Sequence, residues 1–515
     1  MTKNQAFRVK WVFLSLFIGV LVFRAEAQNS DFYKPTWRSV RQHQIPEWLL
    51  DAKFGIYTHW GLKSFPNYRR TKYKVEEPLV PLSELVPQFT AKKFDAAKWG
   101  TLFKKSGARF AVPAVQHSHG YLMWDSELTE WDTMDKGPKR DITGELSEEF
   151  KKQGLKLLVS YHFTEWYRYP HWDGDPEYTD EKKEGIYGPV HDTHLPPATR
   201  VRNKDAKFQS KRSNEFQQLW LNRMDELCRK YEPDVIWFDY QFGGTLAQEN
   251  AGILRGGKLV DPTDVYLRGF SASSQLSFIT NYYNQALDWG KEVEFVYKTY
   301  DVPPGVGMRN IENGILDELT YDPWMTDVTM YEGGSWFYRE GIGYRSANEM
   351  IDLLADVVSK NGVILLNVPP RPDGSFDPEA EEILLEVGQW LEVNGEAIYN
   401  TRPWVIYGEG PSELEVSGHY SQQRSPATFG DGDIRFTLGN DNTIYAIFLA
   451  WPGEHLRIHS LGTRGRLFPG EIREVKLLGT DAEVQWNSNP FDLQVTLPKE
   501  RPCDHAYVLK ISRNP

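Results

Sequence analysis

Cysteine is nearly absent from this sequence, since Cys228 and Cys503 are the only two among 515 residues. Two cysteines cannot build the disulfide framework on which small secreted domains depend, and their wide separation lacks the paired spacing of a structural zinc site. The chain must therefore be held together by hydrophobic cores. Its length, together with 14% aromatic residues, predicts two domains.

The sequence also lacks an excess of positive charge, because its formal net charge is −12 at pH 7. A protein without a basic surface gains little counterion release on nucleic acid and little attraction to anionic lipid. Beyond the N-terminus no apolar run is long enough for a transmembrane helix. We therefore expect a neutral or small ligand, and neither nucleic acid binding nor membrane insertion.

The N-terminus has the pattern of a secretory signal peptide over residues 1–27. Lys3, Arg8 and Lys10 precede an apolar core at 11–23, which is too short to span a bilayer comfortably. Ala25-Glu26-Ala27 then forms a small-x-small cleavage site. The mature chain should begin near Gln28. We therefore expect a secreted or periplasmic protein.

Short apolar runs recur along the chain with amphipathic helical segments between them. This alternation predicts a (β/α)8-type barrel at 34–395, with an open doubly wound sheet as the alternative. The helices have clear start signals, for example a capping box of Ser346 and Glu349 and the Asp377-Pro378 pair. The predicted strands are 54–60, 109–116, 155–163, 235–240, 293–299, 325–331 and 362–368, with an eighth at either 265–270 or 276–282.

The pattern changes to alternating apolar and polar residues after about residue 400. Gly, Pro, Asn and Asp separate these runs, which is typical of an antiparallel β-sandwich. We therefore predict a second, C-terminal domain at 400–515. Its expected strands are 433–438, 443–450, 472–478, 492–497 and 506–511.

The buried strand 235–240 carries an acid at its carboxyl end. Because side chains alternate along a strand, Trp237 and Asp239 share one face. A carboxylate at the C-terminal end of a barrel strand lies where barrel enzymes keep their chemistry. The alternative is an Asp that only caps the following turn.

Three other strand ends carry polar or aromatic side chains. A single histidine is most often structural, but four successive strand ends of this kind predict a polar pocket with an aromatic wall. Two long connections, 61–90 and 166–210, should flank it because loops after barrel strands lie on the catalytic rim. The residues concerned are His59, Trp60, His117, His119 and Tyr161.

Two chemistries fit such a pocket. His117-x-His119 with a later Asp resembles the site of a metal-dependent, amidohydrolase-type hydrolase, although that motif usually occupies the first strand and here the first strand offers only His59. Glycoside hydrolysis needs two carboxylates beside one glycosidic bond, and Asp239 provides the first.

Four segments resemble the α-L-fucosidases of glycoside hydrolase family 29. They are Lys53-Phe54-Gly55-Ile56-Tyr57-Thr58-His59-Trp60-Gly61, Trp237-Phe238-Asp239, Asp301-Val302-Pro303-Pro304-Gly305-Val306 followed by Ile311-Glu312, and Trp390-Leu391-Glu392-Val393-Asn394-Gly395-Glu396-Ala397-Ile398-Tyr399. The resemblance implies an exo-acting, retaining hydrolase that releases terminal α-L-fucose from oligo- or polysaccharides. It implies Asp239 as nucleophile and no metal or organic cofactor.

The same resemblance assigns the substrate-binding residues. It implies that His59, His117, Tyr161 and Trp237 contact the sugar, and we add Trp60 and His119 from their positions at the strand ends. The second strand departs from the family pattern of two adjacent histidines followed by Asp and Gly, because Ser118 replaces the second His and His119 replaces the Asp. α-L-Galactosides and sulfated fucans therefore remain alternative substrates.

The acid/base has three candidates. Glu312 follows a Pro-Pro-Gly turn in what we predict to be a polar loop, and it is our choice. Glu294 lies inside an apolar strand, and Glu318 belongs to an acidic cluster. A catalytically silent carbohydrate-binding paralogue is a further alternative, against which the intact Asp239 argues.

Overall fold

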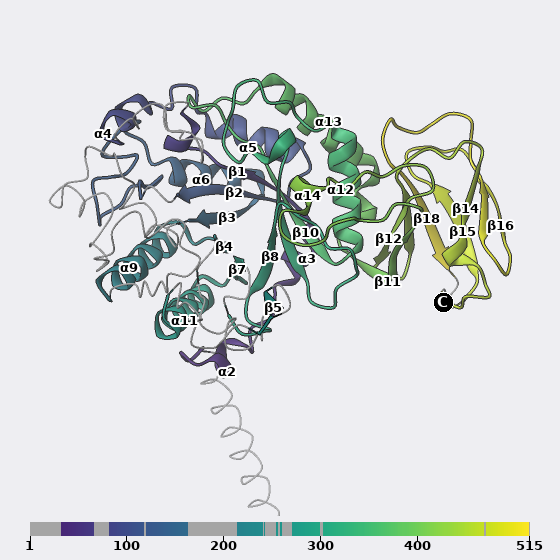
Figure 1. Cartoon of the computed structure of the whole chain (residues 1–515), viewed down its shortest axis with the longest axis horizontal. Coiled ribbons are helices and arrows are strands. Elements are labelled where there is room, and N and C mark those ends of the chain that lie inside the picture. The colour runs from purple at the N-terminus through teal and green to yellow at the C-terminus, as the bar shows by residue number, and fades with distance from the viewer. Residues whose placement is uncertain are drawn as a thin grey trace, which may run out of the picture.

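A closed barrel of eight parallel strands forms the larger part of the protein, and antiparallel sheets form the C-terminal part (Figure 1). This architecture confirms the predicted barrel followed by a β-sandwich and excludes the doubly wound sheet. The computed structural model describes residues 32–65, 82–117, 120–162, 214–239, 242, 254–255, 258–259, 270–298, 302–467 and 470–513. The expected signal peptide lies outside these ranges.

The barrel strands are ordered β1-β10-β9-β8-β7-β4-β3-β2 around the ring. Seven of them coincide with the seven predicted strands, because each is an apolar run bounded by turn residues. Their bounds are β1 (Phe54–Thr58), β2 (Phe110–Gln116), β3 (Lys156–Tyr161), β4 (Val235–Phe238), β7 (Glu294–Lys298), β8 (Met308–Glu312), β9 (Trp324–Thr329) and β10 (Gly362–Asn367).

The eighth strand is β8, which neither predicted alternative included. The range 276–282 lies inside helix α11 (Ala272–Trp289), and 261–269 is outside the described residues. β8 reads Met-Arg-Asn-Ile-Glu, so it has no continuous apolar run, and it begins at Met308, only ten positions after the last residue of β7. Glu312 is consequently the last residue of a strand, and its predicted loop position was wrong.

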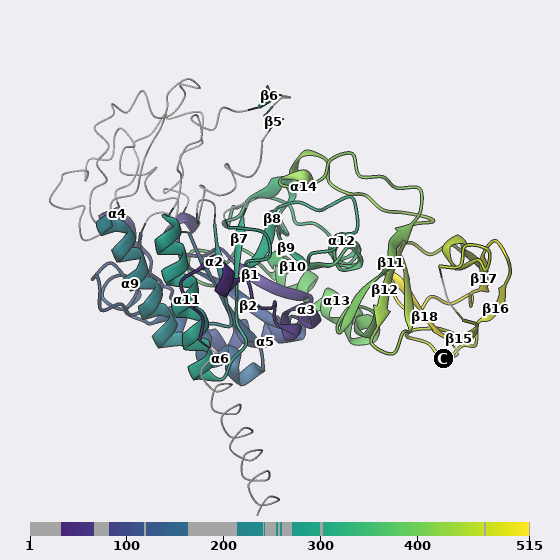
Figure 2. The same cartoon turned by 90° about the horizontal axis from the view of Figure 1, so that it is seen from below.

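Helices pack around the outside of the barrel (Figure 2). Ser346 and Glu349 form the predicted capping box at the start of α12, and Pro378 occupies the first turn of α13. The main helices are α5 (Ala96–Lys105), α6 (Ile142–Gln153), α9 (Asn214–Tyr231), α11, α12 (Ala347–Ser359) and α13 (Pro378–Asn394); shorter ones are α2 (Trp37–Val40), α3 (Glu47–Ala52), α4 (Leu82–Leu85) and α14 (Ser421–Arg424).

Side-chain alternation divides the barrel into an inner and an outer core. Inward residues such as Val112, Leu158, Trp237 and Val296 fill the barrel itself. Their neighbours along the strands pack outward against the helices, as Phe238 does. A residue near a strand end therefore points into the barrel if strand alternation and register place it on the same face as Trp237, and otherwise it points toward the helices.

The C-terminal part contains a five-stranded and a three-stranded antiparallel sheet. The five predicted strands are all present, whereas β11, β14 and β16 were not predicted. The five-stranded sheet has the order β11 (Thr401–Glu409), β12 (Ile434–Gly439), β13 (Ile444–Phe448), β18 (Tyr507–Arg513), β15 (Ile472–Leu477). The three-stranded sheet has the order β14 (His455–Ile458), β17 (Leu493–Thr496), β16 (Gln485–Ser488). A separate two-stranded sheet is formed by β5 (Leu254–Arg255) and β6 (Lys258–Leu259).

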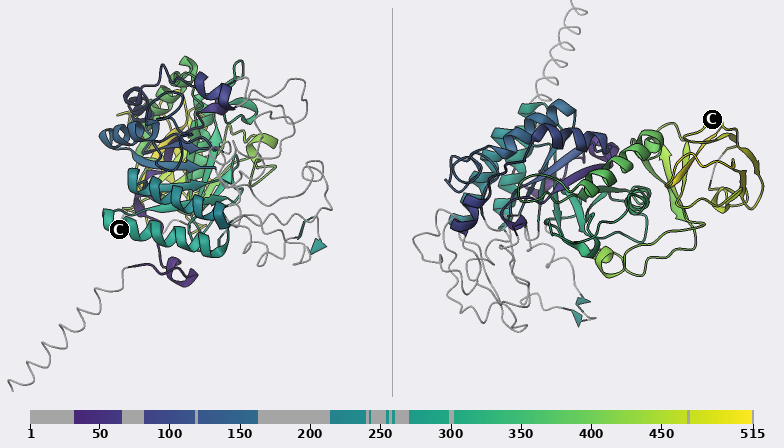
Figure 3. Two further views of the ribbon diagram at one scale, coloured as in Figure 1. Left: turned by 90° about the vertical axis from the view of Figure 1, so that its left-hand side faces the viewer. Right: turned by 90° about the horizontal axis from the view of Figure 1, so that it is seen from above.

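Helices α12 and α13, green in Figure 3, lie between the barrel and the sandwich. Asp356 of α12 is fully buried at this junction and accepts a hydrogen bond of 2.7 Å from Arg435 Nε of β12. Lys360 Nζ lies 2.8 Å from its other oxygen. A buried carboxylate paired with two buried cations is strongly destabilising to break, so these contacts fix the sandwich against the barrel.

Both cysteine thiols are free, with Cys228 buried in α9. Among the described residues, no helix combines the length and the apolar character required to cross a membrane.

Candidate active site

Asp239 lies directly after β4 at the carboxyl end of the barrel strands. Its side chain shares the inward face with Trp237, as the sequence predicted, and it is buried. Lys298, the last residue of β7, places Nζ 2.8 Å from Oδ1, and His162 Nδ1 lies 3.0 Å from Oδ2. Both carboxylate oxygens are therefore held by groups on the neighbouring strands.

The charge environment keeps Asp239 ionised. Burial alone would raise the pKa of its carboxyl group, but Lys298 and His162 outweigh burial and lower this pKa well below its usual value. Burial lowers the pKa of His162, so its ring is neutral. With an ionised carboxylate opposite, Nδ1 of His162 must carry the proton that it donates to Asp239.

The other nitrogen of His162 is also engaged. Nε2 lies 2.7 Å from Ser160 Oγ and 2.9 Å from the hydroxyl of Tyr57, and it accepts a hydrogen bond there because Nδ1 holds the proton. Tyr57 and Ser160 also contact each other. This buried chain of hydrogen bonds fixes both the tautomer and the orientation of the imidazole that supports Asp239.

Glu312 contacts the same lysine as Asp239 and therefore lies near it. Its Oε2 is 3.0 Å from Lys298 Nζ, so the contacted oxygens of the two acids are separated by no more than the sum of 2.8 and 3.0 Å. Retaining glycosidases place their two carboxyl groups about 5 to 5.5 Å apart, and inverting ones about 6.5 Å or more. The spacing here is compatible with the retaining arrangement.

A third acid, Asp327 of β9, completes this cluster. Its Oδ2 lies 3.7 Å from Lys298 Nζ, and Asn310 Nδ2 donates to Oδ1 at 2.5 Å. Burial raises the pKa of Asp327 to about 7, against the lowering effect of Lys298 and with a further contribution from Glu312. Asp327 is therefore an acid that can hold a proton near neutral pH.

Three histidines gather at the ends of β1, β2 and β3. The ligand nitrogens of His59, His117 and His162 lie within 4.8 Å of one another, and the rings of His117 and His162 stack at 4.1 Å. Both nitrogens of His162 take part in the hydrogen bonds above, which leaves His59 and His117 as the ligands that this group of described residues offers. Two histidines from the described residues are fewer than the three protein ligands of a catalytic zinc.

His59 presents one ring nitrogen as an acceptor. Its Nδ1 donates to Asn367 Oδ1 at 2.8 Å, and burial lowers the pKa of the ring well below its usual value. The neutral ring therefore carries a lone pair on Nε2, which suits a hydroxyl donor. Trp336 and Phe337 contact this ring, so they contribute to the predicted aromatic wall, although the sequence did not point to these two residues.

Trp237 contributes an unpaired donor. Its indole is fully buried, Lys298 Nζ lies 4.5 Å from the ring centroid, and within the described residues Nε1 has no hydrogen-bond partner. A buried N–H without a partner costs free energy unless a ligand accepts its hydrogen bond. The ring therefore offers both an apolar face and a donor to this site.

Two expected substrate-binding residues lie outside the cluster. Trp60 packs with Phe89, Phe94 and Trp99 in the outer core, and its Nε1 donates to the carbonyl of Arg371 at 2.9 Å. Tyr161 also faces outward. His119 and Ser118 are outside the described residues, so the departure at the second strand stays an expectation from the sequence.

The outward direction of Tyr161 follows from strand register. Ser160 pairs with Trp237 and faces inward, whereas Tyr161 pairs with the outward Phe238 and reaches the guanidinium of Arg223. Strand alternation therefore gives the inward position at the end of β3 to His162. This residue stood beside Tyr161 in the sequence, and alternation counted from Trp237 would have selected it.

The competing acids lie elsewhere. Glu294 begins β7 and Lys298 ends it, which separates them by about 13 Å at roughly 3.3 Å per residue. Glu294 Oε1 accepts hydrogen bonds from the Tyr283 hydroxyl and from the amide of Phe295, at the opposite rim. Glu318 is exposed, near Asp317.

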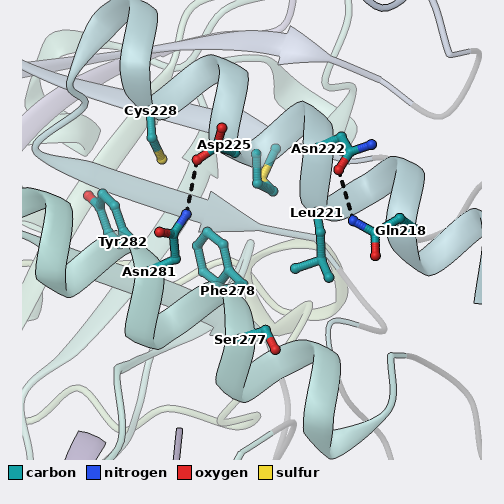
Figure 4. Close-up of a pocket in the computed structure, with 10 residues that line it drawn as sticks. Gln218, Leu221, Asn222, Asp225, Cys228, Ser277, Phe278, Asn281 and Tyr282 are labelled. Carbon is teal, nitrogen blue, oxygen red and sulfur yellow. Dashed lines mark hydrogen bonds between the residues drawn. The ribbon is translucent and has the colours of Figure 1, made fainter. Parts of the chain in front are cut away.

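A groove on the outer surface is separate from this site. It has a volume of about 280 Å³ and lies between α9 and α11 (Figure 4). Leu221 and Phe278 give it an apolar floor, and Asp225 accepts a hydrogen bond from Asn281 across it. None of the strand-end residues lines this groove.

Paired acids at the carboxyl ends of a closed parallel barrel, beside buried histidines and an aromatic wall, are the arrangement of a barrel glycoside hydrolase. Comparison with known proteins agrees. The family model "Alpha-L-fucosidase" matches residues 20–396, and "Alpha-L-fucosidase C-terminal domain" matches residues 429–512. The chain belongs to the alpha-L-fucosidase family.

Relatives and solved structures match over almost the whole chain. Rat tissue alpha-L-fucosidase is 25% identical over 96% of each chain, and human plasma alpha-L-fucosidase is 28% identical over 94% of each. The Thermotoga maritima alpha-fucosidase structure in complex with a mechanism based inhibitor has a TM-score of 0.67 and 23% identity, covering 93% of this chain and 99% of that one. At this identity, the structural match shows the shared fold.

Proposed function

We propose that this protein is an exported, exo-acting and retaining α-L-fucosidase that removes terminal α-L-fucosyl residues from oligo- or polysaccharides. The observation that carries the proposal is the pair Asp239 and Glu312, held beside each other by Lys298. Export rests on the signal-like N-terminus, and the sugar rests on the family.

Asp239 is the nucleophile in this mechanism. Its carboxylate attacks the anomeric carbon, the bond to the leaving oxygen breaks, and a covalent fucosyl-enzyme forms. The hydrogen bond from His162 Nδ1 orients Oδ2, so Oδ1 and Oδ2 are both fixed before substrate binds. Such preorganisation reduces the reorganisation needed in the transition state.

Glu312 is the acid/base. Tyr420 donates from its hydroxyl to Oε2 at 2.8 Å, and Lys298 contacts the same oxygen. Oε1 is therefore the oxygen on which Glu312 carries the proton for the departing alkoxide. In the second step the same group removes a proton from water, which attacks the fucosyl-enzyme and releases fucose with retained configuration.

Lys298 balances charge through both steps. Before reaction, Asp239 is negative and Glu312 must be protonated. In the fucosyl-enzyme, Asp239 is an uncharged ester and Glu312 is negative because it has lost its proton. One cation in contact with both acids therefore neutralises a single negative charge in either state, without moving far.

The remaining groups suit a neutral sugar. His59 offers an acceptor, the indole N–H of Trp237 offers a donor, and the rings of Trp336 and Phe337 offer apolar faces. The ring of His117 contacts the rings of His162 and Phe337, where it can meet a sugar hydroxyl. A carbohydrate needs this mixture of hydrogen-bonding groups and apolar surface.

A labelled intermediate tests the proposal directly. A 2-deoxy-2-fluoro-fucosyl donor should inactivate the enzyme by trapping the ester, and peptide mass spectrometry should locate the label on Asp239. A label on any other residue would remove the nucleophile assignment. Failure of fucosyl donors alongside rapid reaction of the matching α-L-galactosyl donor would instead retain the chemistry and change the sugar.

The departure from the family pattern at Ser118 and His119 leaves the exact sugar open. L-Galactose carries one more hydroxyl than L-fucose, and an apolar pocket rejects such an addition only about a hundredfold. Comparing kcat/KM on 4-nitrophenyl α-L-fucoside and α-L-galactoside measures this preference. Sulfated fucans form a third substrate class for the same assay.

A further inference from the structure

A segment of the C-terminal part reaches back to the barrel rim. Residues 418–422, here called the strap, lie between sandwich strands β11 and β12 and include the first two residues of the short helix α14. Figure 2 shows α14 beside β8 and away from β11 and β12. The sandwich thus contributes a segment to the end of the strand that carries Glu312.

Backbone hydrogen bonds join the strap to residues 312–315. The amides of Gly418, Tyr420 and Gln422 donate to the carbonyls of Ile315, Glu312 and Asn313 at 2.8, 2.7 and 3.1 Å, respectively. The Ser421 hydroxyl also accepts from the amide of Ile315 at 2.9 Å. These bonds fix the two segments at one relative position.

Two strap side chains act on Glu312 itself. The hydroxyl of Tyr420 donates to Oε2 at 2.8 Å, and Nδ1 of His419 accepts from the backbone amide of Glu312 at 3.0 Å. Burial is the largest of the effects that lower the pKa of His419 to about 4, so its ring is neutral near pH 7 and can accept this bond. Glu312 is thus held at its side chain, amide and carbonyl by one short segment.

The local backbone supports a specific role. Tyr420 has φ 61° and ψ 16°, a left-handed conformation that is uncommon for a residue other than Gly, Asn or Asp. Such strain persists only where surrounding contacts determine it. On the barrel side of this contact, a Cβ on Gly314 would lie 2.0 Å from the carbonyl oxygen of Gly418, so only glycine permits this close approach of the two segments.

We propose that Tyr420 and His419 are positioning residues for proton transfer at Glu312, so that the C-terminal domain completes the active site. Tyr420 holds Oε2 and thereby directs Oε1 toward the leaving oxygen, while His419 fixes the main chain that carries the acid. This inference rests on the proposed role of Glu312. It adds a role for a segment more than 100 residues away in the sequence.

The test is the dependence of rate on the leaving group in the full-length enzyme. Tyr420→Phe removes one hydroxyl and keeps the ring, so Glu312 should lose its position. Hydrolysis of natural fucosyl disaccharides, in which the second sugar leaves as an alkoxide that needs a proton, should then slow by about tenfold or more. The same variant should cleave 2,4-dinitrophenyl fucoside, which needs no proton, at nearly the normal glycosylation rate, measured as the initial burst. An equal loss on both substrates would overturn the proposal.

Matched variants separate this role from a structural one. Ser417→Ala removes hydrogen bonds to Asp317 just outside the strap, and both substrates should react at wild-type rates. His419→Asn keeps an acceptor near the position of Nδ1 and should restore most of the activity that His419→Ala loses. A His419→Asn variant as impaired as His419→Ala would count against the backbone contact.

Glu312→Ala, assayed in parallel, distinguishes the two levels of the proposal. Without leaving-group dependence in Glu312→Ala, the acid/base assignment fails, and the strap proposal fails with it. With strong dependence in Glu312→Ala but none in Tyr420→Phe, Glu312 keeps its role and the strap proposal alone is rejected. Thermal unfolding of each variant shows whether it is folded.

Discussion

Lys298 and Asp239 form a buried ion pair at the carboxyl ends of β7 and β4, with 2.8 Å between Nζ and Oδ1. Lys298 is 2% exposed, so the pair is poorly screened by solvent. The lysine also contacts Glu312 and Asp327. One cation among three acids makes the protonation of the whole site depend on this side chain.

Replacing Lys298 should shift the acidic limb of the pH–rate profile. Lys298 lowers the pKa of Asp239, so in Lys298→Met this pKa should rise and a higher pH should be needed to ionise the nucleophile. We expect kcat/KM to fall by at least about a hundredfold at pH 6, with partial recovery as pH rises. The measurement is kcat/KM between pH 4 and 8. Lys291→Met, at the opposite barrel end, is the control, and an unshifted limb would contradict the expectation.

Azide rescue should distinguish the two acids by product configuration. In Asp239→Gly, azide occupies the place of the nucleophile and should give β-L-fucosyl azide from an activated α-fucoside. In Glu312→Ala, azide attacks the fucosyl-enzyme without needing a base and should give α-L-fucosyl azide. NMR of the isolated products identifies the anomers. The same anomer from both variants would show that the roles are misassigned.

Metal removal should leave the rate unchanged. Both nitrogens of His162 are used in hydrogen bonds, so His59 and His117 are assigned to hydroxyl recognition instead of metal binding. Exhaustive dialysis against a chelator, followed by assay in metal-free buffer, should therefore give wild-type kcat. Loss of activity that zinc restores would favour the metal-dependent alternative. His117→Ala should act through weaker transition-state binding of the sugar.

Glu294 should make the protein less stable as pH rises. Burial raises the pKa of this carboxyl group from 4.5 to about 8, so between these values the folded state keeps a proton that the unfolded state has lost. Its stabilising effect is complete below about pH 4.5 and disappears as pH rises through 8. Glu294→Gln keeps the acceptor for Tyr283 but cannot ionise. The change in the free energy of unfolding between low and high pH should therefore be smaller than in the wild type, by up to about a few kcal/mol.

Urea unfolding at pH 5 and pH 8 measures this effect in the wild type and in Glu294→Gln. Glu318→Gln removes an exposed acid and should leave the pH dependence as it is. His43 Nε2 lies 4.0 Å from Glu294, but burial lowers the pKa of His43 to about 4 and the same nitrogen contacts the Val293 carbonyl at 2.7 Å. The imidazole is therefore neutral and provides no compensating charge. If the free energy of unfolding of Glu294→Gln changed with pH as much as that of the wild type, the pH dependence would not come from Glu294.

The sequence predicted most of the barrel because buried parallel strands are apolar runs. β8 was missed because Asn310 and Glu312 face a polar site, so the strand that carries chemistry has the weakest strand pattern. Polar residues needed at the site occupy inward positions of β8 where a buried strand usually has apolar residues. This is why Glu312 was selected as a residue of a polar loop after the Pro-Pro-Gly turn, while the strand that it ends was not recognised.

The site itself was only partly predictable. Asp239 and Trp237 followed from alternation along one strand, and His162 would have followed from the register between two. Lys298 required knowing that β7 lies next to β4, because its partners come from β4, β8 and β9. The Tyr420 contact joins residues 108 positions apart, and no local pattern indicates it.

The buried contact between Asp356 and Arg435 has a consequence for how the enzyme matures. The chain leads from the strap to sandwich strand β11 on one side and β12 on the other, and Arg435 of β12 anchors the sandwich to α12 of the barrel. During synthesis the barrel strands emerge first, and Glu312 then lacks the hydroxyl of Tyr420. On the proposed role of the strap, a nascent chain gains full activity only after the C-terminal strands have emerged and docked.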